Sequence, residues 1–351
     1  MSLSLKRPVA VVGALTLSVA ALSPAFAQSG KANGPGTEWA LGAHSSPPKG
    51  PGPGKLVAWQ VGSGNTRTIT FGTPQSTSGN SFYVGYDAER HTLYVPTVAG
   101  HTDVINARSF APQGDFSSPA GSRVARVSPN HGVLLVLSSK RTVAYSLPAH
   151  KRLFSLSHGG NAVAFSANGN AAYIGGNMNK SLTEVAIPSG KVMHRYPIGH
   201  TGDLVRVDGK LFCADMKSGV MSVLNLRSGR IQRIHTPEVD PHFSYHHIPA
   251  ATAGFMQLAA DPQRHRLYAA GFSGHILEFD TQKPAYLGEI AVKASADKPS
   301  KLSGLALVDH GREALTTVEN LKTAVLVRLS NGKILRRLPG TISNRWVVVK
   351  R

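Results

Sequence analysis

The chain has 351 residues, with 38 Lys and Arg against 19 Asp and Glu, and a single cysteine, Cys213. One cysteine excludes an internal disulfide, and no segment beyond the N-terminal apolar run approaches the about 20 apolar residues of a membrane-spanning helix. The net charge of +19 favours anionic polymers, acidic proteins or an anionic membrane surface as partners. The alternative is that the chain is simply a basic exported protein.

The first residues are typical of an export signal. Lys6 and Arg7 precede an apolar run at residues 9–22, and Ala25-Phe26-Ala27 provides a small-x-small cleavage site. We expect residues 1–27 to be a signal peptide, residues 28–37 a disordered lead-in and residues 38–351 a single domain. The mature protein would then be periplasmic or secreted.

A pattern of about 40 residues recurs along the expected domain. Its clearest copies are residues 161–198, 203–234 and 256–290, with weaker copies at 81–116, 123–156 and 304–338. Short segments with alternating apolar residues are separated by turns rich in Gly, Asn and Asp, which is typical of strands and hairpins. Repeats of four short strands without a helix predict an all-β fold, the β-propeller. The last strand of the copy at 81–116 cannot be placed within residues 109–116.

The two ends of the domain supply one further blade. Residues 56–61 and 66–71 are expected to form its third and fourth strands, residues 38–41 its second, and residues 345–350 its first. Pairing the C-terminal strand with the N-terminal ones would close the ring and remove its open edges. We therefore predict seven blades closed by the N- and C-terminal strands, with six or eight as alternatives. Cys213, in the apolar segment 210–215, is expected to be a buried, inert thiol.

Two segments carry a family resemblance. Thr92-Leu-Tyr-Val-Pro-Thr97, followed by Asp103-Val-Ile-Asn106, resembles the YVTN-type β-propeller repeat, although the Val-Thr-Asn core is nowhere intact in this chain. The resemblance implies an exported propeller, in a superfamily that includes quinoprotein amine dehydrogenase heavy chains. It specifies the blade only, and it carries over no catalytic residues.

Basic residues recur in the loops expected on one face of the ring. Loops between second and third strands, and linkers between blades, emerge together around the mouth of the central channel, where ligands of this fold usually bind. The first group of loops supplies the predicted ligand-binding residues His101, Lys140, Arg141, Lys180, Lys217 and Lys322. The linkers add Arg123, His158, His200, Lys298, Lys301 and Arg345, against the acids Asp203, Asp297 and Glu319. This pattern predicts a mouth that binds an anionic ligand or an acidic protein, although lysines scattered over all loops would look similar.

An insertion at residues 236–254 interrupts the regular spacing and is expected on the same face. His242, His246 and His247 with Asp240 are candidate ligands of zinc or copper, since neutral imidazole and carboxylate oxygens suit those ions. The alternative is a lid packed by Phe243 and Tyr245 with its histidines in solvent. No other cofactor is predicted.

Several enzyme classes lack their required residues. The sequence has no Gly-x-Ser-x-Gly elbow, no Cys-x-x-Cys-His haem site and no phosphate-binding or dinucleotide-binding glycine motif. Aromatic residues are too few to predict specific nucleic-acid binding. Channel carboxylates and amides of a metal-dependent lactonase would have to come from Asn80, Asn161, Asp203 and Glu319. The sequence thus favours an exported binding or scaffold protein. An enzyme or enzyme subunit, either a metal-dependent lactonase or lyase or a quinoprotein dehydrogenase-like heavy chain, is the alternative.

Overall fold

The computed structural model describes residues 38–43, 53–72, 81–245, 247, 250–340 and 343–350. The predicted signal peptide and the lead-in at 28–37 lie outside these residues, so the structure does not bear on them. No helix within the described residues has the length and apolar character needed to cross a membrane.

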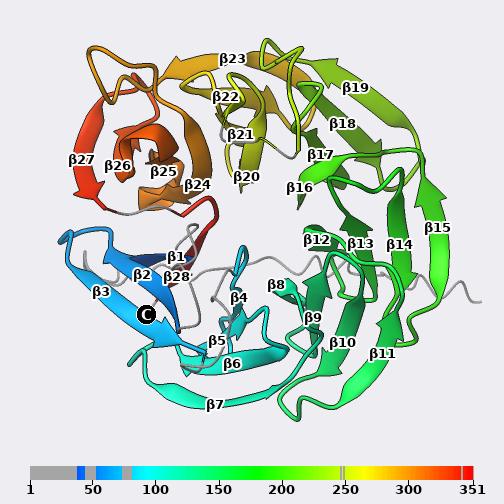
Figure 1. Cartoon of the computed structure of the whole chain (residues 1–351). Coiled ribbons are helices and arrows are strands. Elements are labelled where there is room, and N and C mark those ends of the chain that lie inside the picture. Colours follow the sequence, from blue (N-terminus) through cyan, green and yellow to red (C-terminus); the bar gives the residue numbers. More distant parts are fainter. Residues whose placement is uncertain are drawn as a thin grey trace, which may run out of the picture. The chain divides into compact units, whose positions relative to one another are not determined.

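The described strands form seven four-stranded antiparallel sheets, which are the blades of a ring (Figure 1). From the inside outwards, blade 1 contains β28 (Trp346–Lys350), β1 (Glu38–Ala43), β2 (Gly54–Gln60) and β3 (Thr66–Phe71). Blade 2 contains β4 (Gly85–Asp87), β5 (Thr92–Pro96), β6 (His101–Asn106) and β7 (Pro112–Ser117). Blade 3 contains β8 (Ser122–Val127), β9 (Val133–Ser138), β10 (Thr142–Ser146) and β11 (Arg152–Leu156).

The remaining blades follow in chain order. Blade 4 contains β12 (Ala162–Phe165), β13 (Ala171–Gly175), β14 (Leu182–Ala186) and β15 (Val192–Tyr196). Blade 5 contains β16 (Thr201–Val207), β17 (Lys210–Asp215), β18 (Val220–Asn225) and β19 (Ile231–His235). Blade 6 contains β20 (Phe255–Asp261), β21 (Arg266–Gly271), β22 (His275–Asp280) and β23 (Ala285–Ala291). Blade 7 contains β24 (Leu302–Val308), β25 (Glu313–Val318), β26 (Thr323–Arg328) and β27 (Ile334–Pro339), with short 3-10 turns η2 (Asp309–Gly311) and η3 (Glu319–Leu321).

Blade 1 closes the ring as the sequence predicts. β28 is its innermost strand and pairs antiparallel with β1, so that Trp39 lies opposite Val349 and Leu41 opposite Val347. β1, β2 and β3 then follow outwards as the second, third and fourth strands. The prediction of seven blades and of closure by the two ends of the domain is confirmed.

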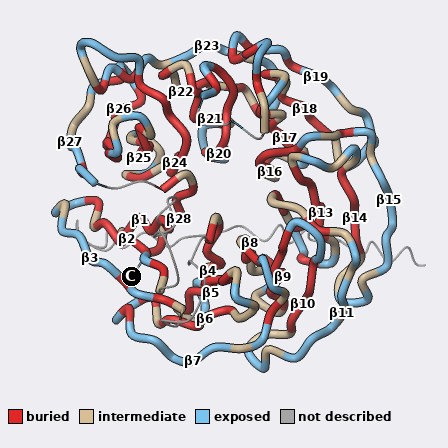
Figure 2. Tube along the Cα trace, in the orientation of Figure 1, coloured by how far each residue is buried: buried red, intermediate tan, exposed pale blue. Residues whose placement is uncertain are grey.

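The apolar core lies between the blades. Seven clusters of buried apolar side chains each join two adjacent blades, including one that packs blade 7 against blade 1. The inner strands are therefore buried on both faces, while the outermost strands are exposed along much of their length (Figure 2). β9 is buried at every residue, whereas β15 is exposed at all but its last. Since each blade buries its faces only against its neighbours, no blade completes its own core.

Two local features depend on the same arrangement. The last strand of blade 2, which the sequence could not place, is β7, an outer strand with mostly exposed residues and Gly114 at its centre. Cys213 lies in β17 with 1% of its surface exposed, as expected. Burial raises the pKa of its thiol well above the usual range, which keeps it protonated and unreactive.

Candidate functional site

Buried polar side chains meet across the centre of the ring. The hydroxyl of Tyr83, which precedes blade 2, donates to Oδ2 of Asp203 in blade 5 at 2.6 Å. The Arg345 guanidinium, which precedes blade 1, donates to the carbonyl of Gly202 at 3.2 Å and lies 5.3 Å from the Tyr83 ring. Blades 2 and 5, like blades 1 and 5, are three steps apart in a ring of seven, so these contacts cross its middle.

Every blade contributes to this central network. The backbone N–H of Leu258 donates to Asp203 at 2.8 Å, and the Arg126 guanidinium lies 4.0 Å from the Tyr83 ring centroid. Gln257 joins blades 6, 7 and 1, because its Oε1 accepts from the N–H groups of Leu305 and Trp346. Blade 4 joins the network because the Asn161 side-chain amide donates a hydrogen bond to the Gly202 carbonyl. Buried groups with this many partners hold the inner strands in place.

The central network corrects part of the predicted mouth. Asp203 and Arg345 are expected in surface loops, yet their exposed fractions are 1% and 6%. Lys301 is also buried; its amine donates to the carbonyl of Ala251 at 2.9 Å, and burial lowers its pKa. Burial also lowers the pKa of half-buried Arg123, which lies 5.1 Å from the Phe82 ring. These groups support the fold instead of facing a partner.

Five predicted residues do remain at the surface of the mouth face, the face on which the linkers and the loops between second and third strands emerge. They are exposed and form no ion pair with another described residue; we call Lys140, Arg141, Lys180, Lys217 and Lys322 the rim residues. His101 differs, because it begins β6, is half-buried and lies 3.3 Å from the Asp103 carboxylate. The structure therefore separates His101 from the other predicted ligand-binding residues.

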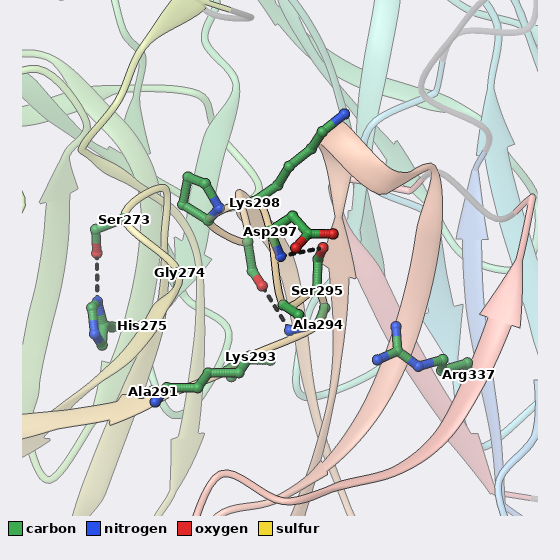
Figure 3. Close-up of a pocket in the computed structure, with 14 residues that line it drawn as sticks. Ser273, Gly274, His275, Ala291, Lys293, Ala294, Ser295, Asp297, Lys298 and Arg337 are labelled. Atoms are coloured by element: carbon green, nitrogen blue, oxygen red, sulfur yellow. Dashed lines mark hydrogen bonds between the residues drawn. The ribbon is translucent and has the colours of Figure 1, made fainter.

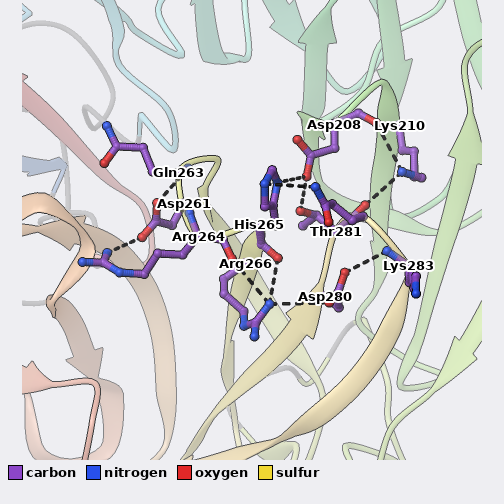
Figure 4. A network of polar contacts seen from close by, with 11 residues as sticks. Asp208, Lys210, Asp261, Gln263, Arg264, His265, Arg266, Asp280, Thr281 and Lys283 are labelled. Atoms are coloured by element: carbon purple, nitrogen blue, oxygen red, sulfur yellow. Dashed lines mark hydrogen bonds and ion pairs between the residues drawn. The ribbon is translucent and has the colours of Figure 1, made fainter. Parts of the chain in front are cut away.

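Charges on the opposite face are arranged differently. In the turns between first and second strands, arginines bind the carboxylates of their own turn, as Arg90 binds Asp87 and Arg264 binds Asp261. Arg264 also donates to the carbonyl of His310 in the next blade, and His265 bonds Asp208 of the preceding blade (Figure 4). The outer turns of this face carry Lys191, Arg230 and Lys333, which are exposed and form no ion pair within the described chain.

The described residues of the insertion at 236–254 pack onto the mouth face as a lid. Its Phe243 is buried with Met216 and Phe272 in an apolar cluster, and Tyr245 packs against that cluster. Glu238 is buried beneath it, accepting from the N–H groups of Gly254 at 2.8 Å and Ser273 at 3.3 Å. The alternative prediction of a lid packed by Phe243 and Tyr245 fits these contacts.

The carboxylates of the lid stabilise its backbone. Glu238 also bonds the hydroxyl of Ser273, and a Cβ on Gly271 would overlap its carboxylate, so a larger residue there would displace the Glu238 side chain. Burial raises the pKa of Glu238, although its hydrogen bonds oppose that shift. Asp240 accepts from the N–H groups of Thr252 and His242, and these bonds lower its pKa.

The predicted metal ligands are not tested by this arrangement. Within the described residues, no group of three or more His, Cys, Asp or Glu side chains is placed to hold a metal ion. His242 and His247 are exposed, while His246 lies outside the described part of the chain. The zinc or copper site therefore stays a prediction.

Three hollows between neighbouring blades differ in charge. The largest, of about 770 Å³, lies between blades 6 and 7 at the mouth face (Figure 3), and its charged or titratable lining residues are His275, Lys293, Asp297, Lys298 and Arg337. A second, of about 550 Å³ between blades 2 and 3, has Arg141, His150 and Arg152 and no acid among its described lining residues. A third, of about 660 Å³, lies at the opposite face and balances Arg264, Arg312 and Arg328 against Glu278, Asp309 and Glu313. The mouth-face hollow between blades 6 and 7 thus has an excess of basic side chains, as does the hollow between blades 2 and 3, which runs from Arg141 at the mouth face to the turn of His150 at the opposite face.

Comparisons with known proteins establish the fold alone. No family model matches the sequence, and a search of curated proteins finds no match. The hydrazine synthase of Kuenenia stuttgartiensis has a similar structure, with a TM-score of 0.62 and 9% identity, covering 78% of this chain and 96% of that one. U3-55K is also similar, with a TM-score of 0.61 and 9% identity, covering 75% of this chain and 83% of that one. These similarities identify the chain as a seven-bladed β-propeller.

Proposed function

We propose that this chain is an exported binding or scaffold protein, with YVTN-like blades, that engages an anionic ligand or an acidic protein through its mouth face. The observation that carries the proposal is the difference between the hollows. The one at the mouth face between blades 6 and 7 has three basic side chains against one acid, and the one at the opposite face is balanced. A concave basic surface attracts anions because the surrounding protein focuses the field.

The exposed rim residues support the same proposal. No described carboxylate forms an ion pair with them, so a partner's acidic groups would not have to displace an internal ion pair. The contacts of Asp203 give the enzyme alternative less support. Asp203, the carboxylate expected in the channel, is engaged by Tyr83 and by the N–H of Leu258.

The test is the salt dependence of binding to polyglutamate, a flexible polyanion with acidic-protein chemistry. Affinity is expected to fall steadily as sodium chloride rises from 0.05 to about 0.5 M, because salt screens exposed charges. Replacing Lys140, Arg141 and Lys180 together by Glu is expected to weaken binding by about a hundredfold, since three attractions become repulsions. An affinity for polyglutamate that changes neither with salt nor with these substitutions would exclude the proposed function.

A further inference from the structure

The hollow between blades 2 and 3 combines apolar and basic walls. One wall is the end of β7 with the linker that follows it, and the other is formed by β10 and β11 of blade 3. Phe116, Val143 and Tyr145 give it an apolar side. A volume of about 550 Å³ lies within the range of small-ligand sites.

The aromatic side of this hollow is fixed by contacts of its own. The Phe116 ring meets the edge of Tyr145 at 4.9 Å and stacks on His150 at 4.5 Å with an interplanar angle of 15°. The Tyr145 hydroxyl donates to the carbonyl of Ser117 at 3.0 Å. A ligand would therefore meet a preformed surface and would not have to order these side chains.

The charge of the hollow is positive. Arg141 and Arg152 are exposed, line it from two different segments and form no ion pair with a described residue. None of its described lining residues is acidic. Burial lowers the pKa of His150, so near pH 7 the positive charge comes from the two guanidinium groups.

Two buried polar atoms of the lining have no partner within the described chain. They are the hydroxyl oxygen of Ser118, whose residue is 9% exposed, and Nε2 of His150. Both atoms lie beneath the surface of the hollow, and the polar side chains of the lining that a ligand can reach are the exposed Ser117 and Ser155.

We propose that this hollow binds a uronate residue of an acidic polysaccharide. The carboxylate of the sugar would pair with Arg141 or Arg152, whose planar donors suit carboxylates. Its hydroxyl groups would hydrogen-bond the exposed Ser117 and Ser155, and the C–H face of the ring would pack against the apolar side of the hollow at Phe116.

This inference rests on the proposed function and adds a ligand class and a subsite to it. The test is calorimetric titration of the full mature chain with hexagalacturonate, with maltohexaose as the neutral sugar. We expect one hexagalacturonate per chain and no binding of maltohexaose. Arg152→Gln is expected to weaken hexagalacturonate binding by about tenfold, the usual effect of losing one charge-assisted hydrogen bond.

A second variant separates shape from charge. Ser155 is exposed on β11 and pairs with Val143 across the sheet, so Ser155→Trp would fill the hollow without changing any charge. It is expected to abolish hexagalacturonate binding and to leave polyglutamate binding within twofold. Arg195→Gln, which removes an exposed arginine from the outer strand of blade 4, is the matched control and should leave both unchanged.

Each other outcome overturns the inference. Equal binding of maltohexaose, equal losses in Arg195→Gln and Arg152→Gln, or unchanged hexagalacturonate binding in Ser155→Trp would each show that this hollow is not a uronate site. Polyglutamate binding without hexagalacturonate binding would reject the site and retain the proposed function. If the unmodified protein binds neither polyglutamate nor hexagalacturonate, both the uronate site and the proposed function are rejected.

Discussion

The two faces of the ring use their charges in different ways. On the opposite face, carboxylates such as Asp87 and Asp208 pair with side chains of their own turn or of the neighbouring blade. On the mouth face, the charges expected at the surface are divided. Asp203 and Arg345 are buried in the central network, while Lys140 and the other rim residues stay exposed and form no ion pair with a described residue. Buried charges therefore stabilise the ring at its centre and in the turns of the opposite face, while the rim residues, like Lys191, Arg230 and Lys333 in the outer turns of the opposite face, remain exposed.

The largest effect on stability is expected at the central network. Asp203→Ala leaves the Tyr83 hydroxyl and the N–H of Leu258 without an acceptor and should lower the free energy of unfolding by about 3–5 kcal/mol. Urea unfolding measures the change. Asp297→Ala, an exposed mouth-face carboxylate, is the control and should change it by less than about 0.5 kcal/mol. A loss below about 1 kcal/mol for Asp203→Ala would show that the central network does not brace the ring.

The next effect is expected on the opposite face. Asp87 accepts from Arg90 and from His131 of the next blade, both at 2.8 Å. Asp87→Asn should cost about 1–3 kcal/mol, because it weakens a buried, charge-assisted pair. The measurement is again urea unfolding, with Asp115→Asn on the exposed strand β7 as the control. Equal stabilities of the two variants would mean that this turn does not join the blades.

Lowering the pH should remove the stability that Asp87 and a second carboxylate of this face, Asp208, contribute. Burial alone would raise the pKa of Asp87 and Asp208, but hydrogen bonds from Arg90, or from Thr281 and His265, outweigh it and hold both below the usual range. Their contribution to stability is complete above the unfolded value of about 3.9 and is lost as pH falls through the lower folded values. The double variant Asp87→Asn, Asp208→Asn should therefore lose less stability than the unmodified chain between about pH 5 and pH 2. Parallel urea midpoints across that range would contradict this assignment.

The lid should respond to pH with the opposite sign. Burial raises the pKa of Glu238, so stability is highest below the unfolded value of about 4.3 and declines as pH rises through the higher folded value. In Glu238→Gln this decline should be absent, which urea midpoints between about pH 4 and pH 7 would reveal. Retention of the full decline in the variant would assign it to another group.

The smallest effect on stability is expected at the rim. Lys140, Arg141 and Lys180 form no ion pair with a described residue, so replacing all three by Glu should change the free energy of unfolding by less than about 1 kcal/mol. Thermal or urea unfolding checks this directly. A large loss would indicate that the rim residues support the fold as the opposite-face carboxylates do.

The fold could be predicted from local pattern, and the centre of the ring could not. Turns such as Asp208-Gly209 and the alternation of apolar residues repeat within each blade, and the unmatched strands at the two ends require closure. The sequence did not place β7, because an exposed outer strand shows little alternation of apolar and polar residues. In contrast, Tyr83 and Asp203 are 120 residues apart, and Arg345 and Gly202 are 143 apart.

One signal for the central network is present in the sequence. A polar residue stands just before several inner strands, as Asn161 and Arg345 do, or at the third residue, as Asp203 and Gln257 do. Aligning the repeat copies with one another would place these polar residues at equivalent positions in successive blades, which indicates a ring of polar side chains around the centre. Which of them point inwards depends on irregular pairing at the start of β16 and β20, where bulges turn the side chains, and repeat spacing does not encode those bulges.

The most direct test compares the two faces within one binding experiment. Lys140, Arg141 and Lys180 on the mouth face are matched by Lys191, Arg230 and Lys333 in the outer turns of the opposite face, because each set has two lysines and one arginine, all exposed. Polyglutamate affinity at 0.15 M salt would be measured for both triple substitutions to Glu. The mouth-face variant is expected to lose binding by about a hundredfold, and the opposite-face variant by less than about threefold at this screening length. Equal losses would contradict the account, because net charge alone would then explain binding.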